Sequence, residues 1–81
     1  MSPKTPRNVS GSDLIKLFSK YGYEVVRQKG SHIRLSRTSG EGTHNLTIPN
    51  HNPIKLGTFN AILSDAANQL KISKDDLIGN L

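Results

Sequence analysis

Residues 27–37 bring together side chains that could do chemistry on a polyanion. The segment reads Arg-Gln-Lys-Gly-Ser-His-Ile-Arg-Leu-Ser-Arg, so four cations surround one histidine, His32, and no acid is present. The imidazole of histidine titrates near neutral pH, and arginine and lysine side chains pair with phosphate. A histidine held beside such cations is therefore placed to move a proton on a bound polyanion.

The alternation of apolar and polar residues predicts a β-strand that presents His32. Ile33 and Leu35 alternate with polar residues, and successive side chains of a strand point to opposite faces. If these two residues enter a core, His32 and Arg34 share the opposite face. Gly30 permits the tight turn that would place His32 near the start of the strand.

The residues before this segment predict a helix. Ser10 and Asp13 have the spacing of a capping box. Val9 and Leu14 have the spacing of a hydrophobic staple. Apolar residues then recur at helical spacing until Gly22 ends the helix, so one face of it is expected to be core.

The rest of the chain predicts three strands and two more helices. We expect strands over residues 23–28, 31–37 and 44–49, a turn at Lys29-Gly30, loops over 38–43 and 50–57, a helix over 58–70, and a short helix that Ser73 caps. Each longer helix has one apolar stripe, so both must cover the same face of the sheet. Residues 1–8 are expected to be a flexible leader, and residues 9–81 a single domain.

The predicted order of elements defines the fold class. It is α+β, an α-β-β-β-α two-layer sandwich with a three-stranded antiparallel sheet and helices on one face. The same order occurs in double-stranded-RNA-binding domains, which read RNA shape through phosphate and 2′-hydroxyl contacts. Topology alone does not set function, so this similarity suggests a class of partner and no more.

Composition favours a nucleic-acid partner and excludes other classes. The net charge of the 81 residues is +5, and residues 1–37 hold eight Lys and Arg against two acids. Clustered cations attract nucleic acid by counterion release. Because the chain has no cysteine, disulfides and thiolate metal sites are excluded. No apolar run approaches the roughly 18 residues of a membrane span and no signal peptide is visible, so we expect a cytoplasmic protein without a membrane contact.

Five short motifs, spread over roughly residues 9–79, resemble those of one protein family. They are Ser10-Gly11, Gly22-Tyr23, Arg27-Gln28-Lys29-Gly30-Ser31-His32, Ile48-Pro49-Asn50-His51 and Leu56-Gly57-Thr58. The chain resembles the HicA family, small toxins of type II HicA–HicB toxin–antitoxin systems. The resemblance implies an mRNA interferase, that is, an endoribonuclease acting on mRNA, with the fold described above and a HicB-type antitoxin as protein partner. It also implies that His32, the histidine of Gly-Ser-His, is catalytic.

The chemistry of RNA fits this assignment independently. A general base that removes the proton of a 2′-hydroxyl lets that oxygen attack the adjacent phosphate, without a metal or cofactor, and contributes roughly 10²- to 10⁴-fold. The residues expected to bind RNA phosphate are Arg27, Lys29, Ser31, Arg34 and Arg37. His51 is a candidate auxiliary residue. The sequence shows no obvious acid for the leaving 5′-oxygen.

Several alternatives stay open at this point. A non-catalytic RNA-binding module would keep the basic face without needing His32, and a regulatory domain would use the open face only to hold a protein partner. His51 could bond the backbone of its loop or reach the face of His32, whereas His44 is expected to be an ordinary strand-end residue. The spacing of the three histidines matches no known metal motif, so no metal site is expected.

Overall fold

The computed structural model describes residues 8–81 and has the predicted α+β architecture. Its elements are α1 (Gly11–Ser19), β1 (Glu24–Lys29), β2 (His32–Ser39), β3 (Gly42–Pro49), α2 (Leu56–Leu70) and α3 (Lys74–Gly79). The strands form one antiparallel sheet in the order β1-β2-β3. This is the fold type of double-stranded-RNA-binding domains. The expected leader, residues 1–8, lies outside the described residues apart from Asn8, so it stays a prediction, as does the single domain over 9–81.

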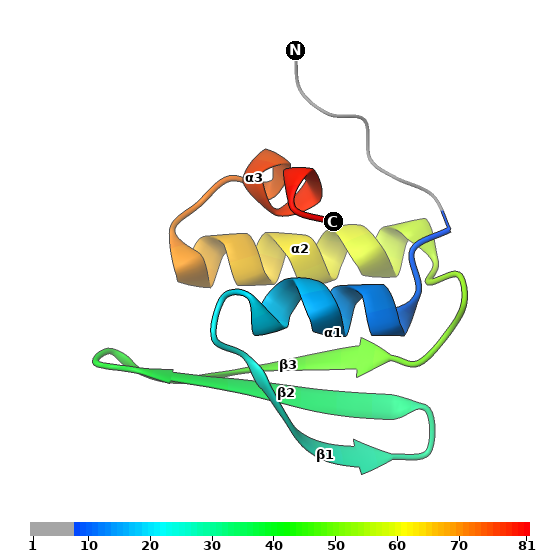
Figure 1. The fold of residues 1–81 in the computed structure, drawn as a ribbon, viewed down its shortest axis with the longest axis horizontal. Coiled ribbons are helices and arrows are strands. Elements are labelled where there is room, and N and C mark those ends of the chain that lie inside the picture. The colour runs from blue at the N-terminus through cyan, green and yellow to red at the C-terminus, as the bar shows by residue number, and fades with distance from the viewer. Residues whose placement is uncertain (1–7) are drawn as a thin grey trace.

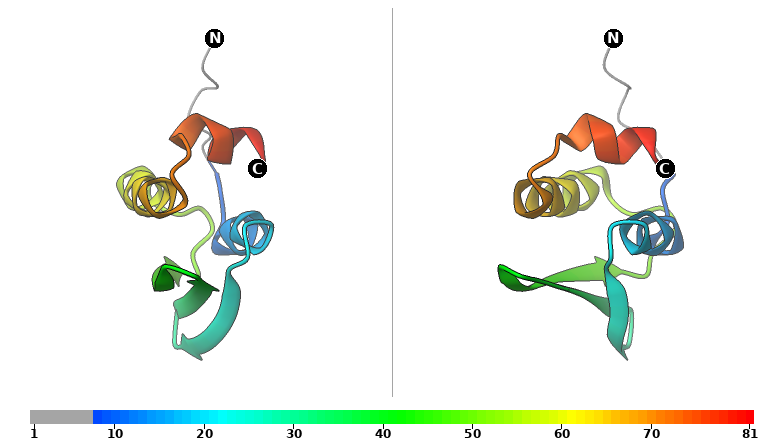
Figure 2. Two further views of the ribbon diagram at one scale, coloured as in Figure 1. Left: turned by 90° about the vertical axis from the view of Figure 1, so that its left-hand side faces the viewer. Right: turned by 60° about the vertical axis from the view of Figure 1, so that its left-hand side comes forward.

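The helices lie on one side of the sheet, as their single apolar stripes predicted. α1 and α2 lie side by side over one face, and α3 lies beyond them, on the side away from the sheet (Figures 1 and 2). The other face of the sheet carries no helix in the described part of the chain. None of the helices formed by residues 8–81 is long and apolar enough to cross a membrane.

The predicted capping box of α1 is confirmed, whereas the helix ends at Ser19 with Lys20 as its C-cap, before Gly22. The Ser10 hydroxyl accepts a hydrogen bond from the Asp13 N–H, and the Asp13 carboxylate accepts one from the Ser10 N–H, at 3.1 and 3.0 Å. The hydrogen bond from the Ser10 N–H holds the pKa of the Asp13 carboxyl below its ordinary value. After the helix, Gly22 has φ +94°, a conformation that glycine adopts without strain, and the Tyr23 N–H turns back to the Phe18 carbonyl.

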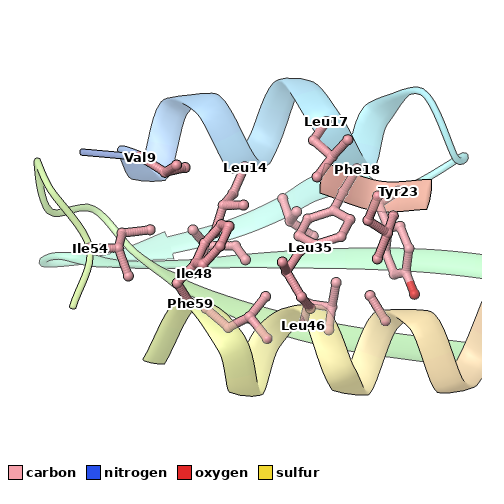
Figure 3. Packing of buried hydrophobic residues seen from close by; sticks show 14 of the residues in the cluster. Val9, Leu14, Leu17, Phe18, Tyr23, Leu35, Leu46, Ile48, Ile54 and Phe59 are labelled. Carbon is pink, nitrogen blue, oxygen red and sulfur yellow. The ribbon is translucent and has the colours of Figure 1, made fainter. Parts of the chain in front are cut away.

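The hydrophobic core lies between the sheet and the two long helices. Ile33 and Leu35 of β2 and Leu46 and Ile48 of β3 are buried, which confirms the alternation expected from the sequence. Figure 3 shows the side chains of α1 and α2 meeting over these strands. The largest side chains with almost no exposed surface are Phe18, Phe59, Leu14, Leu17, Leu35, Ile48, Leu63 and Leu77.

The prediction of a loop over residues 38–43 is wrong. β2 and β3 continue through most of it, and only Gly40 and Glu41 lie between them. Thr38 pairs with Thr43, and their hydroxyl oxygens are 3.2 Å apart. The composition is polar and glycine-rich because this end of the hairpin extends past the core, where neither face needs apolar residues.

His44 is held on the helix-facing side of the sheet. Its Nδ1 lies 2.8 Å from the Tyr23 hydroxyl oxygen, and its Nε2 lies 3.3 Å from a carboxylate oxygen of Asp65 in α2. The Tyr23 and His44 rings also meet edge to face. His44 therefore links the sheet to α2 and takes no part in the open face.

Replacing Tyr23 by phenylalanine should cost about 1 kcal/mol at neutral pH, the usual net value of one hydrogen bond. Burial raises the pKa of the Tyr23 hydroxyl above its ordinary value of 10.0, with Arg37 partly opposing this effect. Because the fold favours the protonated phenol, this stabilisation is complete below pH 10 and is lost as the pH rises through the raised pKa. Urea unfolding of both proteins should show their difference in free energy shrinking above pH 10. A difference that stays constant would contradict this account.

Candidate active site

A β-bulge in β1 decides which of its side chains share the open face. Val25 pairs with Leu35, but the next pair along the ladder is Arg27 with Arg34. Val26 is therefore an extra residue in β1. In a regular ladder, Val26 would take the place opposite Arg34, and Arg27 would turn toward the helices. Because of the bulge, Arg27 lies on the open face, directly opposite Arg34.

Beyond the bulge, Lys29 lies directly opposite His32. The two residues flank the turn formed by Gly30 and Ser31, in which Gly30 has φ +58°. His32 opens the central strand and also pairs with Pro49 of β3, so its backbone is held on both sides. Opposed residues of an antiparallel pair have Cβ atoms roughly 4.5–5.5 Å apart. A phosphate that contacts the His32 imidazole is therefore within reach of the Lys29 ammonium.

These side chains surround a hollow of about 680 Å³, hereafter the cationic hollow. Its lining residues are Arg27, Lys29, Gly30, Ser31, His32, Arg34 and Thr47. This lining includes no carboxylate, and none of its cations forms an ion pair with a carboxylate of residues 8–81. Like charges that face each other across a sheet are unfavourable. A cluster of this kind suits an anion that neutralises it.

Replacing Arg34 by glutamine should raise stability while weakening RNA binding. Removing one of two opposed arginines relieves a repulsion of roughly 0.2–1 kcal/mol, and the gain should fade as salt screens the charges. If Arg34 contacts one RNA phosphate, the slope of log affinity against log salt should fall by about 0.7 for a single strand. Thermal unfolding and salt-dependent RNA binding measure the two effects. Lys16→Gln, at an exposed position of α1, is the matched control, and an equal change in its slope would contradict the assignment.

The structure leaves one predicted phosphate-binding residue outside this group. Arg37 lies on the helix-facing side of β2, and its Nε donates to the Tyr21 carbonyl at 2.9 Å. It thereby satisfies a carbonyl just after α1, beside Gly22. Ser31 does line the cationic hollow, but its hydroxyl makes no hydrogen bond to His32 in the described structure. The structure thus brings the other four predicted phosphate-binding residues to His32 and separates Arg37 from them.

A second hollow, of about 370 Å³, adjoins the first and is hereafter the His51 hollow. Its lining residues are His32, Thr47, Pro49, His51, Ile54, Lys55 and Thr58. Since His32 and Thr47 line both hollows, these two side chains stand at the border between them. Of the two alternatives for His51, the structure favours the one in which its side chain reaches the face of His32.

Main-chain hydrogen bonds hold the loop that carries His51. The Gly11 N–H donates to the His51 carbonyl at 3.0 Å, and the Asn50 N–H donates to the Ser31 carbonyl at 2.6 Å. A Cβ atom on Gly11 would lie 2.7 Å from the Pro49 carbonyl oxygen, so only glycine lets α1 approach this closely. The loop is therefore tied both to the start of α1 and to the residue before His32.

Two residues of the hollows were missed by the sequence analysis. Thr47 could have been found, because it alternates with Leu46 and Ile48 and so faces the open side. Lys55 gave no signal, because α2 was expected to begin at residue 58 and in fact begins at Leu56. Lys55 is the N-cap of α2, and a cation is electrostatically unfavourable at the N-terminus of a helix. The facing pair of Arg27 and Arg34 is unfavourable too, because like charges repel.

The three histidines do not gather at one place. His32 and His51 line one hollow, whereas His44 lies on the other side of the sheet, against Tyr23 and Asp65. Within residues 8–81, no group of three or more His, Asp or Glu side chains is arranged to hold a metal ion.

Fold and site together define a class: a small basic α+β domain that presents a histidine among clustered cations on an open sheet face. The family model described as "HicA toxin of bacterial toxin-antitoxin" matches residues 11–67, which is more than half of the chain and includes every residue of both hollows. The chain belongs to the HicA family of toxins, which implies a paired antitoxin. No curated protein and no solved structure gave a significant match.

Proposed function

We propose that this toxin is a metal-independent endoribonuclease, an mRNA interferase, with His32 as its general base. The observation that carries the proposal is the exposed His32 side chain in a hollow whose lining contains three cations and no carboxylate. Neutral imidazole can take the proton of an RNA 2′-hydroxyl, and the freed oxygen then attacks the adjacent phosphate. DNA lacks this hydroxyl, so the mechanism selects RNA.

The cations supply the second part of the mechanism. Attack by the 2′-oxygen concentrates negative charge on the phosphate, and donors that are already in place stabilise that charge without reorganising. Lys29, opposite His32, is the nearest candidate in register. Arg27 and Arg34 face each other beside it and would bind the same or a neighbouring phosphate, and the Ser31 hydroxyl would donate to a phosphate oxygen.

The test of this function is cleavage of a defined single-stranded RNA in EDTA. We expect products with a 2′,3′-cyclic phosphate and a 5′-hydroxyl, and no cleavage of the same sequence made as DNA. RNA that carries a 2′-O-methyl group at the mapped cleavage position should resist. If the protein binds all these RNAs and cuts none of them, it is a non-catalytic RNA-binding module instead.

We also infer a HicB-type antitoxin as partner, with both proteins acting in the cytoplasm. A partner that offers carboxylates to Lys29 and Arg34 would cover His32 and neutralise the toxin through the charges that bind RNA. The complex should then weaken at high salt and protect His32 from chemical modification of its imidazole. A salt-insensitive complex in which His32 stays reactive would contradict this docking mode.

A further inference from the structure

We propose that the His51 hollow receives the nucleoside that leaves, and that His51 is the general acid that protonates its 5′-oxygen. The inference rests on the proposed ribonuclease function and assigns the role of acid, which the sequence alone left open, to His51. It starts from the position of His32, which borders both hollows. An RNA strand that passes over His32 would have its phosphates in the cationic hollow on one side and would enter the His51 hollow on the other.

The geometry of phosphate transfer requires a second group. The attacking and leaving oxygens lie roughly in line on opposite sides of phosphorus. A base beside the 2′-oxygen is therefore badly placed to protonate the 5′-oxygen in the same step. His51 lines the hollow next to His32 and comes from a different segment, the loop after β3, so the two imidazoles can flank one phosphate.

The two hollows have different linings, which suit phosphate binding in one and binding of the leaving nucleoside in the other. The cationic hollow is lined by charged and small polar side chains, whereas Pro49 and Ile54 give the His51 hollow an apolar wall for a sugar or base. Ile54 is 6% exposed, and its N–H donates to the Val9 carbonyl at 2.8 Å, so this wall is fixed. Lys55 adds one exposed cation, which suits the next phosphate of the strand.

The loop also positions His51 without using its side chain. The bonds that tie the loop to Gly11 and Ser31 are made by main-chain atoms. The His51 imidazole makes no hydrogen bond with described residues and is exposed. A structural role thus explains the backbone of His51 but leaves its side chain free for substrate.

Protons and electron pairs balance in the proposed step. His32 takes the 2′-hydroxyl proton as the bond between the 2′-oxygen and phosphorus forms. The bond between phosphorus and the 5′-oxygen breaks, its electron pair goes to the 5′-oxygen, and protonated His51 supplies the proton. The products are a 2′,3′-cyclic phosphate and a 5′-hydroxyl, and proton exchange with water returns both histidines to their starting states.

The test compares two RNAs that differ only in the leaving atom at the mapped cleavage site, 5′-oxygen or 5′-sulfur. A thiolate leaves without protonation, because a thiol is far more acidic than an alcohol. We expect His51→Gln to slow cleavage of the oxygen substrate by roughly 10²- to 10⁴-fold, as for loss of a general acid, and to cleave the sulfur substrate nearly as fast as wild type.

The controls separate this inference from the proposed function. His32→Gln should slow both substrates, and Asn45→Ala, on the same open face outside both hollows, should slow neither. Equal losses on both substrates for His51→Gln, or no loss at all, would overturn the acid role while the nuclease stands. A selective loss in Lys55→Ala would overturn it in favour of Lys55. If wild type cuts neither substrate, the proposed function itself fails.

Discussion

Replacing His32 by glutamine should strongly slow RNA cleavage while leaving the fold and RNA binding intact. Loss of a general base costs roughly 10²- to 10⁴-fold in rate. The His32 side chain is exposed, and exposed substitutions usually change stability by less than about 0.5 kcal/mol. In the proposed mechanism the phosphate contacts come from other side chains, so affinity should change little. Single-turnover cleavage, RNA binding and thermal unfolding on one preparation measure the three quantities.

The selectivity of this effect is what supports catalysis. Arg34→Gln should weaken binding, most strongly at low salt, whereas His32→Gln should lower only the rate of the bound complex. Asn45→Ala is the neutral control on the same face. A His32→Gln protein that cuts RNA at the wild-type rate would remove His32 from the mechanism. One that loses binding and cleavage in parallel would make it a binding residue.

Replacing Phe18 by alanine should strongly destabilise the fold. Its side chain has no exposed surface and meets the Tyr23 ring edge to face, with ring centroids 5.6 Å apart. Phe→Ala in a core costs about 3–5 kcal/mol. A domain of 81 residues has a total stability of roughly 4–12 kcal/mol at the usual value per residue. One truncation therefore removes a large part of the total, and urea unfolding measures it.

The matched control is Val25→Ala in β1. Val25 is 51% exposed even though it is apolar and lies in a strand, so its loss should change stability by about 0.5 kcal/mol or less. Every residue of β1 is exposed. The buried contacts that stabilise the fold therefore come mainly from the helices and the two other strands. If Val25→Ala cost as much as Phe18→Ala, this distribution of stability would be wrong.

Local patterns were enough to predict most of the fold. The capping pair of Ser10 and Asp13, the helical spacing that follows it, and the alternation of Ile33 and Leu35 each depend on neighbours in sequence. One buried face decides such patterns, and the face of His32 follows from them. The grouping of His32 with Arg34 could therefore be predicted from residue order alone.

Other parts of the site depend on contacts between distant segments. Arg37 and Arg34 are both arginines of β2, but Arg37 lies on the helix-facing side, where its side chain donates a hydrogen bond to the Tyr21 carbonyl. Lys55 reaches the hollow only because main-chain bonds fold its loop against Ser31 and Gly11. Charge and residue type alone do not distinguish these outcomes, so the sequence grouped Arg37 with His32 and gave no sign that Lys55 lies near it.

The extra residue in β1 means that two single-codon losses in this strand would have opposite consequences. Loss of Val26 would make the ladder regular and leave Arg27 opposite Arg34, so the cationic hollow would keep its charges. Loss of Gln28 would also make the ladder regular, but it would place Val26 opposite Arg34 and turn Arg27 toward the helices. When family members are compared, the position of a gap in this strand is therefore as informative as the residues on either side of it.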